Sequence, residues 1–163
     1  MRSSERRNLP RPPIYRAEIL QKAPWFAGPP ATRGRKALGV RYEELVHREF
    51  LQRYPGYLAS MWIRFEDRDG EKYCQPDGLL VNPWQGILTI IEVKYQHTNA
   101  AYYQMFDLYL PVLQVIFGGC YQLACCEVVK WYDAAIYTDV PAALCRHPDL
   151  ASPGLFNVHI WRP

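Results

Sequence analysis

Residues 75–78 read QPDG and residues 90–94 read IIEVK, and these two stretches decide the expected fold and chemistry. An acidic residue closes one β-like run, and an acid and a lysine two positions apart close the next. Side chains alternate between the two faces of a strand, so Glu92 and Lys94 point the same way. Two carboxylates and an ammonium on one sheet face are costly to bury unpaired. This arrangement suits a divalent metal ion and a phosphate.

These residues predict a site for phosphodiester hydrolysis, which needs a nucleophilic water and stabilisation of charge on the phosphate. Asp77 and Glu92 are candidate ligands of Mg²⁺, with Mn²⁺ as a substitute, and the backbone carbonyl of Val93 can add a neutral ligand. Lys94 lies about 6–7 Å beyond Glu92 along the strand, where its ammonium can orient the attacking water or help to deprotonate it. Pro76 cannot donate to a sheet ladder, so we expect a bend that turns Asp77 toward Glu92.

The order of elements predicts an α/β (α+β) fold, a mixed central sheet flanked by helices in the order α-β-β-β-α-β. A helix over 37–54 precedes strands over 57–65, 72–81 and 87–94, with a hairpin turn at 67–70 and an apolar, central third strand. A second helix begins at Thr98 or Asn99, is kinked or divided at Pro111 and ends at 118–119. A strand over 122–132, a short helix or turn over 141–145 and a strand over 155–161 follow.

The first helix offers further acids to the site. Glu43 shares a helix face with Val46 and Phe50, which we expect to point inward with Leu51, so Glu43 can complete the cluster. Glu44 is the alternative, about 100° further around the axis. His47, one turn after Glu43, can join the site, although pairing with a nearby acid is the preferred interpretation.

The first 36 residues form a basic, proline-rich arm ahead of a domain over 37–163. The arm holds nine Lys or Arg and two Glu, whereas the remainder holds ten Lys or Arg and fourteen Asp or Glu. This asymmetry suits a polyanion, with Arg33, Arg35 and Lys36 as candidate phosphate contacts, but a solvated leader explains it equally well. We expect the arm to be extended or irregular, with a short helical turn near 15–22 and with Trp25 and Phe26 pinning it to the core.

Composition predicts a cytoplasmic protein. No stretch is long and apolar enough to span a bilayer, and the basic N-terminus lacks the apolar core of a signal peptide. Five cysteines without a CxxC pair indicate reduced thiols rather than a disulfide framework or a zinc site.

The joint pattern resembles the signature of the PD-(D/E)XK nuclease superfamily. Pro76-Asp77 and then Glu92-Val93-Lys94 match its core motif, and Gly39 to Glu43 resembles the first-helix glutamate motif of many members, including archaeal Holliday-junction resolvases and RecB-like exonucleases. Gln104 and Tyr109 resemble the glutamine–tyrosine motif of the RecB-like and phage-exonuclease branch, at a spacing one residue longer than QxxxY. The resemblance covers about residues 37–132.

The resemblance implies a restriction-endonuclease-like core and an Mg²⁺-dependent nuclease acting on DNA, in repair, recombination or a phage or mobile element. Asp77, Glu92 and Glu43 would hold the metal and Lys94 would activate or orient water. The residues expected to contact nucleic acid are Arg33, Arg35, Lys36, His97, Gln104 and Tyr109. A catalytically inactive nucleic-acid-binding or assembly protein of the same fold is the alternative, and a homodimer or a targeting partner is compatible with either.

Overall fold

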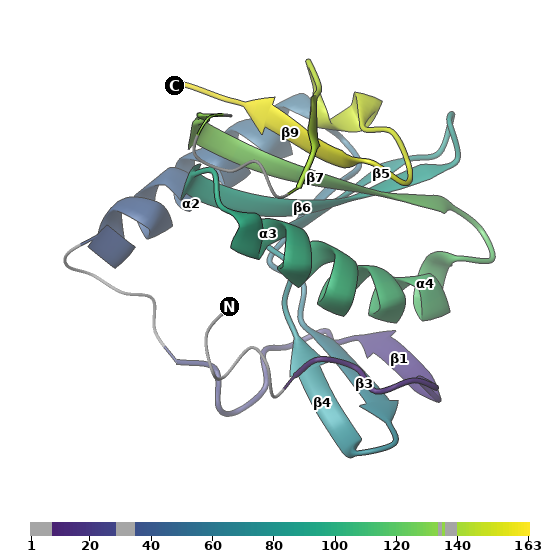
Figure 1. The fold of residues 1–163 in the computed structure, drawn as a ribbon. Helices are drawn as coiled ribbons and strands as arrows, with labels where there is room; N and C mark the ends of the chain where they lie inside the picture. Colours follow the sequence, from purple (N-terminus) through teal and green to yellow (C-terminus); the bar gives the residue numbers. More distant parts are fainter. Residues whose placement is uncertain (1–7, 29–34, 134, 136–139) are drawn as a thin grey trace.

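The chain folds around two β-sheets, with helices covering both faces of the larger one (Figure 1). The computed structural model describes residues 8–28, 35–133, 135 and 140–163. The strands are β1 (Arg16–Ile19), β2 (Tyr57–Ala59), β3 (Ile63–Asp67), β4 (Gly70–Cys74), β5 (Gly78–Asn82), β6 (Ile87–Gln96), β7 (Gln122–Trp131), β8 (Ala142–Leu144) and β9 (Phe156–Ile160). The helices are α2 (Arg35–Arg53), α3 (Asn99–Tyr103), the π-helix η1 (Gln104–Tyr109), α4 (Leu110–Phe117) and the 3₁₀-helix η2 (Pro148–Leu150). The expected mixed α+β architecture is therefore confirmed.

The larger sheet is mixed, as predicted, and has the strand order β2-β5-β6-β7-β9-β8. The β2–β5 and β5–β6 pairs are antiparallel, whereas β6–β7, β7–β9 and β8–β9 are parallel. Strand β6 lies in the middle and its residues 88–93 are all buried, which confirms the prediction of a covered central strand. One face of β6 packs in a cluster with Met105 and Leu113 of the second helical segment, and the other packs in a cluster with Val46 and Phe50 of α2.

Helix α2 lies on the larger sheet through a single buried stripe. Tyr42, Val46, Phe50 and Tyr54 recur every four residues and are all buried. Leu51 was expected to point inward, but it is 56% exposed, because it lies about 100° around the axis from Phe50. The helix ends at Arg53, just before the Pro55-Gly56 stop.

The prediction of two continuous strands over 57–65 and 72–81 is wrong, because each is broken where the chain crosses between the sheets. The first break, after β2, contains Ser60 in a left-handed conformation with φ of 50°. The second contains Pro76, where the predicted bend is confirmed. The two breaks lie side by side, since the Ser60 N–H donates to the Asp77 carbonyl at 2.7 Å. One long hairpin therefore gives its base to the large sheet and its tip to the three-stranded sheet β1-β3-β4.

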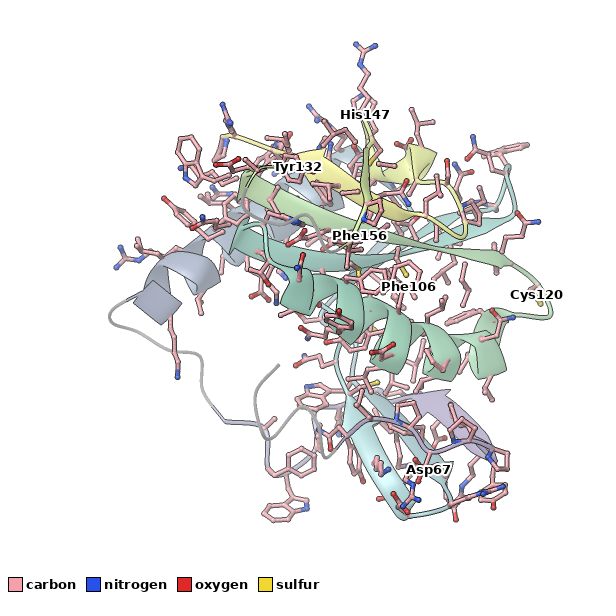
Figure 2. The ribbon with its side chains drawn as sticks, viewed as in Figure 1. Asp67, Phe106, Cys120, Tyr132, His147 and Phe156 are labelled. Carbon is pink, nitrogen blue, oxygen red and sulfur yellow. The ribbon has the colours of Figure 1, made fainter. Side chains whose placement is uncertain are left out.

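A buried hydrogen-bond network around Asp67 joins residues of the arm to the hairpin tip. The predicted turn at 67–70 joins β3 and β4, and Asp67 lies at the end of the small sheet far from the large sheet (Figure 2). Its carboxylate accepts hydrogen bonds from the Lys72 ammonium at 2.8 Å and from the backbone N–H groups of Arg11 and Asp69 at 2.6 and 2.8 Å. Burial raises the pKa of Asp67, but these donors outweigh it and hold this pKa below its ordinary value.

The helical turn expected near 15–22 is also wrong, because this segment forms β1 and pairs antiparallel with β3. The free edge of β3 offers backbone partners that a single helical turn cannot match. The expected pinning of the arm is confirmed for Phe26, whose ring centroid lies 5.8 Å from that of Trp62 and 5.1 Å from that of Tyr73. Trp25, in contrast, is 95% exposed.

The second predicted helix begins and ends as expected but is divided in an unforeseen way. The Thr98 side chain caps α3 by accepting a hydrogen bond from the Ala100 N–H at 3.0 Å, and Gly118 is the C-cap of α4. Between α3 and α4 the chain forms six residues of π-helix. Pro111 falls in the first turn of α4, where its missing N–H is tolerated.

The C-terminal third confirms the strands over 122–132 and 155–161 as β7 and β9, but the helix or turn expected over 141–145 is replaced by strand β8 on the sheet edge. The five cysteines are free thiols, and Cys74, Cys125 and Cys126 are buried. Within the described ranges no helix combines the length and the apolar character that crossing a membrane requires.

Candidate active site

The two predicted strand acids meet across the β5–β6 pair. Gly78 is paired with Ile91 at the end of this antiparallel ladder, and Asp77 and Glu92 are the next residues along the two chains. The two carboxylates are close enough for the charge of Asp77 to raise the pKa of Glu92. The Asp77 Oδ2 atom accepts a hydrogen bond from the Val93 N–H at 2.7 Å. Because β5 begins only at Gly78, no strand residue before it accepts from this N–H, and the Asp77 carboxylate takes that place.

Glu92 has one oxygen bound and one oxygen free of hydrogen bonds. The side chain is 1% exposed, and Oε1 accepts a hydrogen bond from the Lys94 Nζ atom. Oε2 is buried and has no hydrogen-bond partner within the described part of the chain. A buried charged acceptor left without a donor is costly, so this oxygen suits a cation supplied from outside the chain.

The electrostatics of the cluster show a shortage of positive charge. Burial, followed by repulsion from Asp77, raises the pKa of Glu92 although the Lys94 ammonium opposes the shift. Burial also raises the pKa of Asp77, with Lys94 opposing and the Glu43 carboxylate adding to the rise. The ionised form of both carboxyls is therefore destabilised, and a further cation nearby would stabilise it.

Lys94 is held as a charged donor. Burial lowers the pKa of its ammonium, but the carboxylates of Glu92 and Asp77 outweigh burial and raise this pKa above its ordinary value. The side chain is 29% exposed, so the ammonium has a route to solvent. Of the two predicted roles, orienting a water and stabilising charge fits this state, whereas removing a proton does not.

Glu43, rather than Glu44, is the helix acid whose charge reaches the strand acids. The Glu43 carboxylate raises the pKa of both Asp77 and Glu92, whereas the Glu44 side chain is exposed. Glu43 Oε1 lies 3.2 Å from His47 Nε2, which confirms the preferred pairing of this histidine with an acid.

Gln104 and Tyr109 form a contact despite their long spacing. The Gln104 Nε2 atom donates to the Tyr109 hydroxyl at 2.5 Å, and this hydroxyl donates to the Gln75 carbonyl at 2.9 Å. In a π-helix, residues five apart occupy the same face, so η1 accommodates the extra residue. Tyr109 is buried and supports the break that carries Asp77, and its contact with nucleic acid stays a prediction.

His97 lies in the core beside Glu127, and its contact with nucleic acid stays a prediction. His97 is 1% exposed, and its Nδ1 atom lies 2.5 Å from Oε2 of Glu127, whose Oε1 accepts the Thr98 N–H at 3.2 Å. Glu127 lies in register with Glu92 on the neighbouring strand β7. Glu127 was not among the predicted site residues, and its position as the one acid in the apolar run 123–129 is the signal that could have identified it.

The basic residues predicted to contact phosphate lie near the start of α2. Lys36 is exposed in the first turn of this helix and Arg35 begins it, while Arg33 lies outside the described residues. Their role in binding therefore stays a prediction.

The expected metal ion, Mg²⁺, requires oxygen ligands from the cluster. Nowhere in the described ranges do three or more His, Cys, Asp or Glu side chains form a group arranged to hold a metal. Mg²⁺, however, is usually bound through one or two carboxylates and retains several waters. Asp77 and Glu92, with the unpartnered Oε2 atom, fit this requirement. The Val93 carbonyl as a further ligand stays a prediction.

Comparison with known proteins adds no assignment to this geometry. No protein-family model matches the chain, no curated protein matches it and no solved structure matches it. The function must therefore be inferred from the residues of the site.

Proposed function

We propose that this chain is a Mg²⁺-dependent nuclease with a PD-(D/E)XK-type, restriction-endonuclease-like core. When each broken strand is counted once, the order α2, β2/β3, β4/β5, β6, α3–α4 and β7 agrees with the α-β-β-β-α-β order of that core. The first acid of the motif precedes β5 and accepts from the Val93 N–H beside the second acid, and the lysine of the motif donates to the second acid.

The unpartnered, buried Oε2 atom of Glu92 beside Asp77 is the observation that carries the proposal. Most buried polar atoms in native proteins have a hydrogen-bond partner, so an unpartnered carboxylate oxygen beside a second carboxylate suits a bound cation. Asp77 and Glu92 would hold Mg²⁺, which polarises a phosphate oxygen and lowers the pKa of a bound water when it is present.

The residues of the chain supply the remaining functions. The Lys94 ammonium, kept charged by its two acidic neighbours, orients the attacking water and stabilises negative charge on the phosphate. The Val93 N–H holds the Asp77 carboxylate in place, and Glu43 adds negative charge from the α2 side. Tyr109 fixes the strand break through its bond to the Gln75 carbonyl.

Nucleic acid is the substrate class that the charges favour. Lys36 and Arg41 of α2 are exposed, and the first 36 residues carry an excess of seven positive charges. Such residues bind phosphates without regard to sequence, and their binding weakens as salt increases.

The proposal is tested by incubating the protein with linear, circular, single-stranded and branched DNA, and with RNA, in Mg²⁺, in Mn²⁺ and in EDTA. Cleavage is expected in either metal and absent in EDTA. Removing one group that stabilises charge in the transition state typically lowers the rate about 10²–10³-fold. The cleavage rates of Asp77→Asn, Glu92→Gln and Lys94→Ala should therefore fall to that extent or below detection.

Glu44→Gln is the matched control, because Glu44 is exposed and adjoins Glu43 on the same helix. It should retain full activity, whereas Glu43→Gln should lose part of it. Cleavage that survives Asp77→Asn and Lys94→Ala would sink the proposal. Salt-sensitive binding without cleavage in any metal would instead favour the non-catalytic alternative.

A further inference from the structure

Four aromatic side chains form a partly exposed group, here called the aromatic ledge, on the outer side of the small sheet. Its members are Trp25, Phe26, Trp62 and Tyr73. The Phe26 ring lies at the centre, with centroids 5.8 Å from Trp25, 5.8 Å from Trp62 and 5.1 Å from Tyr73, and the three contacts are edge-to-face. Trp25 is 95% exposed and Phe26 is 46% exposed.

The ledge is attached to the strand breaks that carry the candidate active site. Tyr73 precedes Asp77 by four residues, so their Cα atoms are at most about 14 Å apart. Trp62 follows Ser60 by two residues, and the Ser60 N–H donates to the Asp77 carbonyl. Trp62 and Tyr73 therefore lie on the two chain segments that meet at Asp77, the residue proposed to bind metal.

The sequence around Trp25 has the charge that a nucleic acid requires. Between residues 20 and 42 the chain carries five basic residues and no acidic residue, namely Lys22, Arg33, Arg35, Lys36 and Arg41. Lys22 and Lys36 are exposed. Exposed aromatic rings on a basic segment of the chain match a base attached to a phosphate backbone, since every base can stack and every phosphate is anionic.

We propose that the aromatic ledge stacks on an unpaired base, so that the substrate of the adjacent site contains a single-stranded segment. This inference rests on the proposed function for the identity of the site, but the binding it describes can be measured without cleavage. Trp25 supplies the outermost ring, and Phe26 holds it against Trp62 and Tyr73.

The test measures the Kd of the full chain in EDTA for short single-stranded DNA and RNA oligonucleotides and for a DNA duplex of equal charge. Stacking of one base is worth about 1–3 kcal/mol, so Trp25→Ala should weaken binding of single strands about tenfold and leave duplex binding unchanged. Trp84→Ala is the matched control, because Trp84 is 97% exposed but lies on the β5–β6 turn, at the opposite end of β6 from Lys94.

The inference is overturned if the wild type does not bind single strands. It is also overturned if Trp25→Ala binds them as tightly as the wild type, or if Trp84→Ala loses as much affinity. An equal loss on the duplex would point to general phosphate binding and would also overturn it. If single-strand binding depends on Trp25 but no substrate is cleaved, the stacking inference is supported and the proposed nuclease function is refuted. If substrates are cleaved but single-strand binding does not depend on Trp25, the nuclease function is supported and the stacking inference is refuted.

Discussion

Two buried glutamates on neighbouring strands allow a sharp test of the site by thermal unfolding. Glu92 and Glu127 are in register on β6 and β7, and both are at most 1% exposed. Glu127 has both oxygens in hydrogen bonds, to His97 and to the Thr98 N–H, whereas Oε2 of Glu92 lacks a partner. The same substitution to glutamine should therefore change stability in opposite directions.

Glu92→Gln is expected to stabilise the metal-free protein. The glutamine carbonyl can still accept from Lys94, and the substitution removes a buried charge that Asp77 repels. An unsatisfied buried charged group costs about 1–3 kcal/mol or more, and part of that gain is offset because Lys94 loses a charged partner. A net gain of about 1 kcal/mol corresponds to a rise of about 2–4 °C in Tm for a chain of this size. Glu127→Gln should lower stability by about 1–3 kcal/mol, because it breaks a satisfied buried pair.

The assay is thermal unfolding followed by circular dichroism, in mildly alkaline buffer with EDTA and then with MgCl₂. Mg²⁺ should raise the Tm of the wild type, since a ligand present at a hundred times its Kd stabilises by about 2.7 kcal/mol. Glu127→Gln should respond to Mg²⁺ as the wild type does, and Glu92→Gln should not respond. If Glu92→Gln lost as much stability as Glu127→Gln, or kept the full response to Mg²⁺, Glu92 would be a structural residue and the metal site would be refuted.

Three further predictions follow from the same contacts. Burial raises the pKa of both strand carboxyls, so the folded state retains protons that the unfolded state has released. The free energy of unfolding in EDTA should therefore fall as pH rises through the raised pKa values. The affinity for Mg²⁺, measured by calorimetry, should rise over the same pH range. Deleting the exposed Asp107 should convert the π-helix into an α-helix that keeps Gln104 and Tyr109 on one face, with a Tm within about 3 °C of the wild type; a loss of cooperative unfolding would contradict this. Asp67→Ala should destabilise by about 3 kcal/mol because it removes the buried acceptor shared by the Lys72 ammonium and the Arg11 and Asp69 N–H groups, and limited trypsin digestion should cut the arm sooner than in the wild type.

The parts of the fold that follow local rules could be predicted from the sequence. The apolar run before Glu92 fixed the central strand, the spacing of Val46 and Phe50 placed α2, and the Asp-rich turn at 67–70 placed the hairpin. The proximity of Asp77 and Glu92 was also predictable, because it needs only a hairpin of ordinary length and a bend at Pro76. These features depend on residues close together in the sequence or on strict alternation.

The features that escaped prediction depend on distant contacts. Nothing near residue 16 shows that β3 has a free edge for it, so strand β1 was taken for a helical turn. The charge of Glu127 is satisfied by His97, thirty residues away in the sequence, and this pairing places a residue predicted to contact phosphate in the core. Hydrogen bonds across such separations are decided by the assembled fold rather than by local propensity.

Several departures from regular structure lie around the candidate site. A strand is interrupted at Pro76, Ser60 adopts a positive φ, the helix over the site is π rather than α, and a carboxylate oxygen lacks a donor. Each departure costs stability, and the first three have a structural compensation in the bonds that join the breaks and fix the Tyr109 hydroxyl. The oxygen of Glu92 has no such compensation within the described residues. Since departures from local rules are expected at functional sites, this uncompensated oxygen supports the proposed metal site over a purely irregular connection between two sheets.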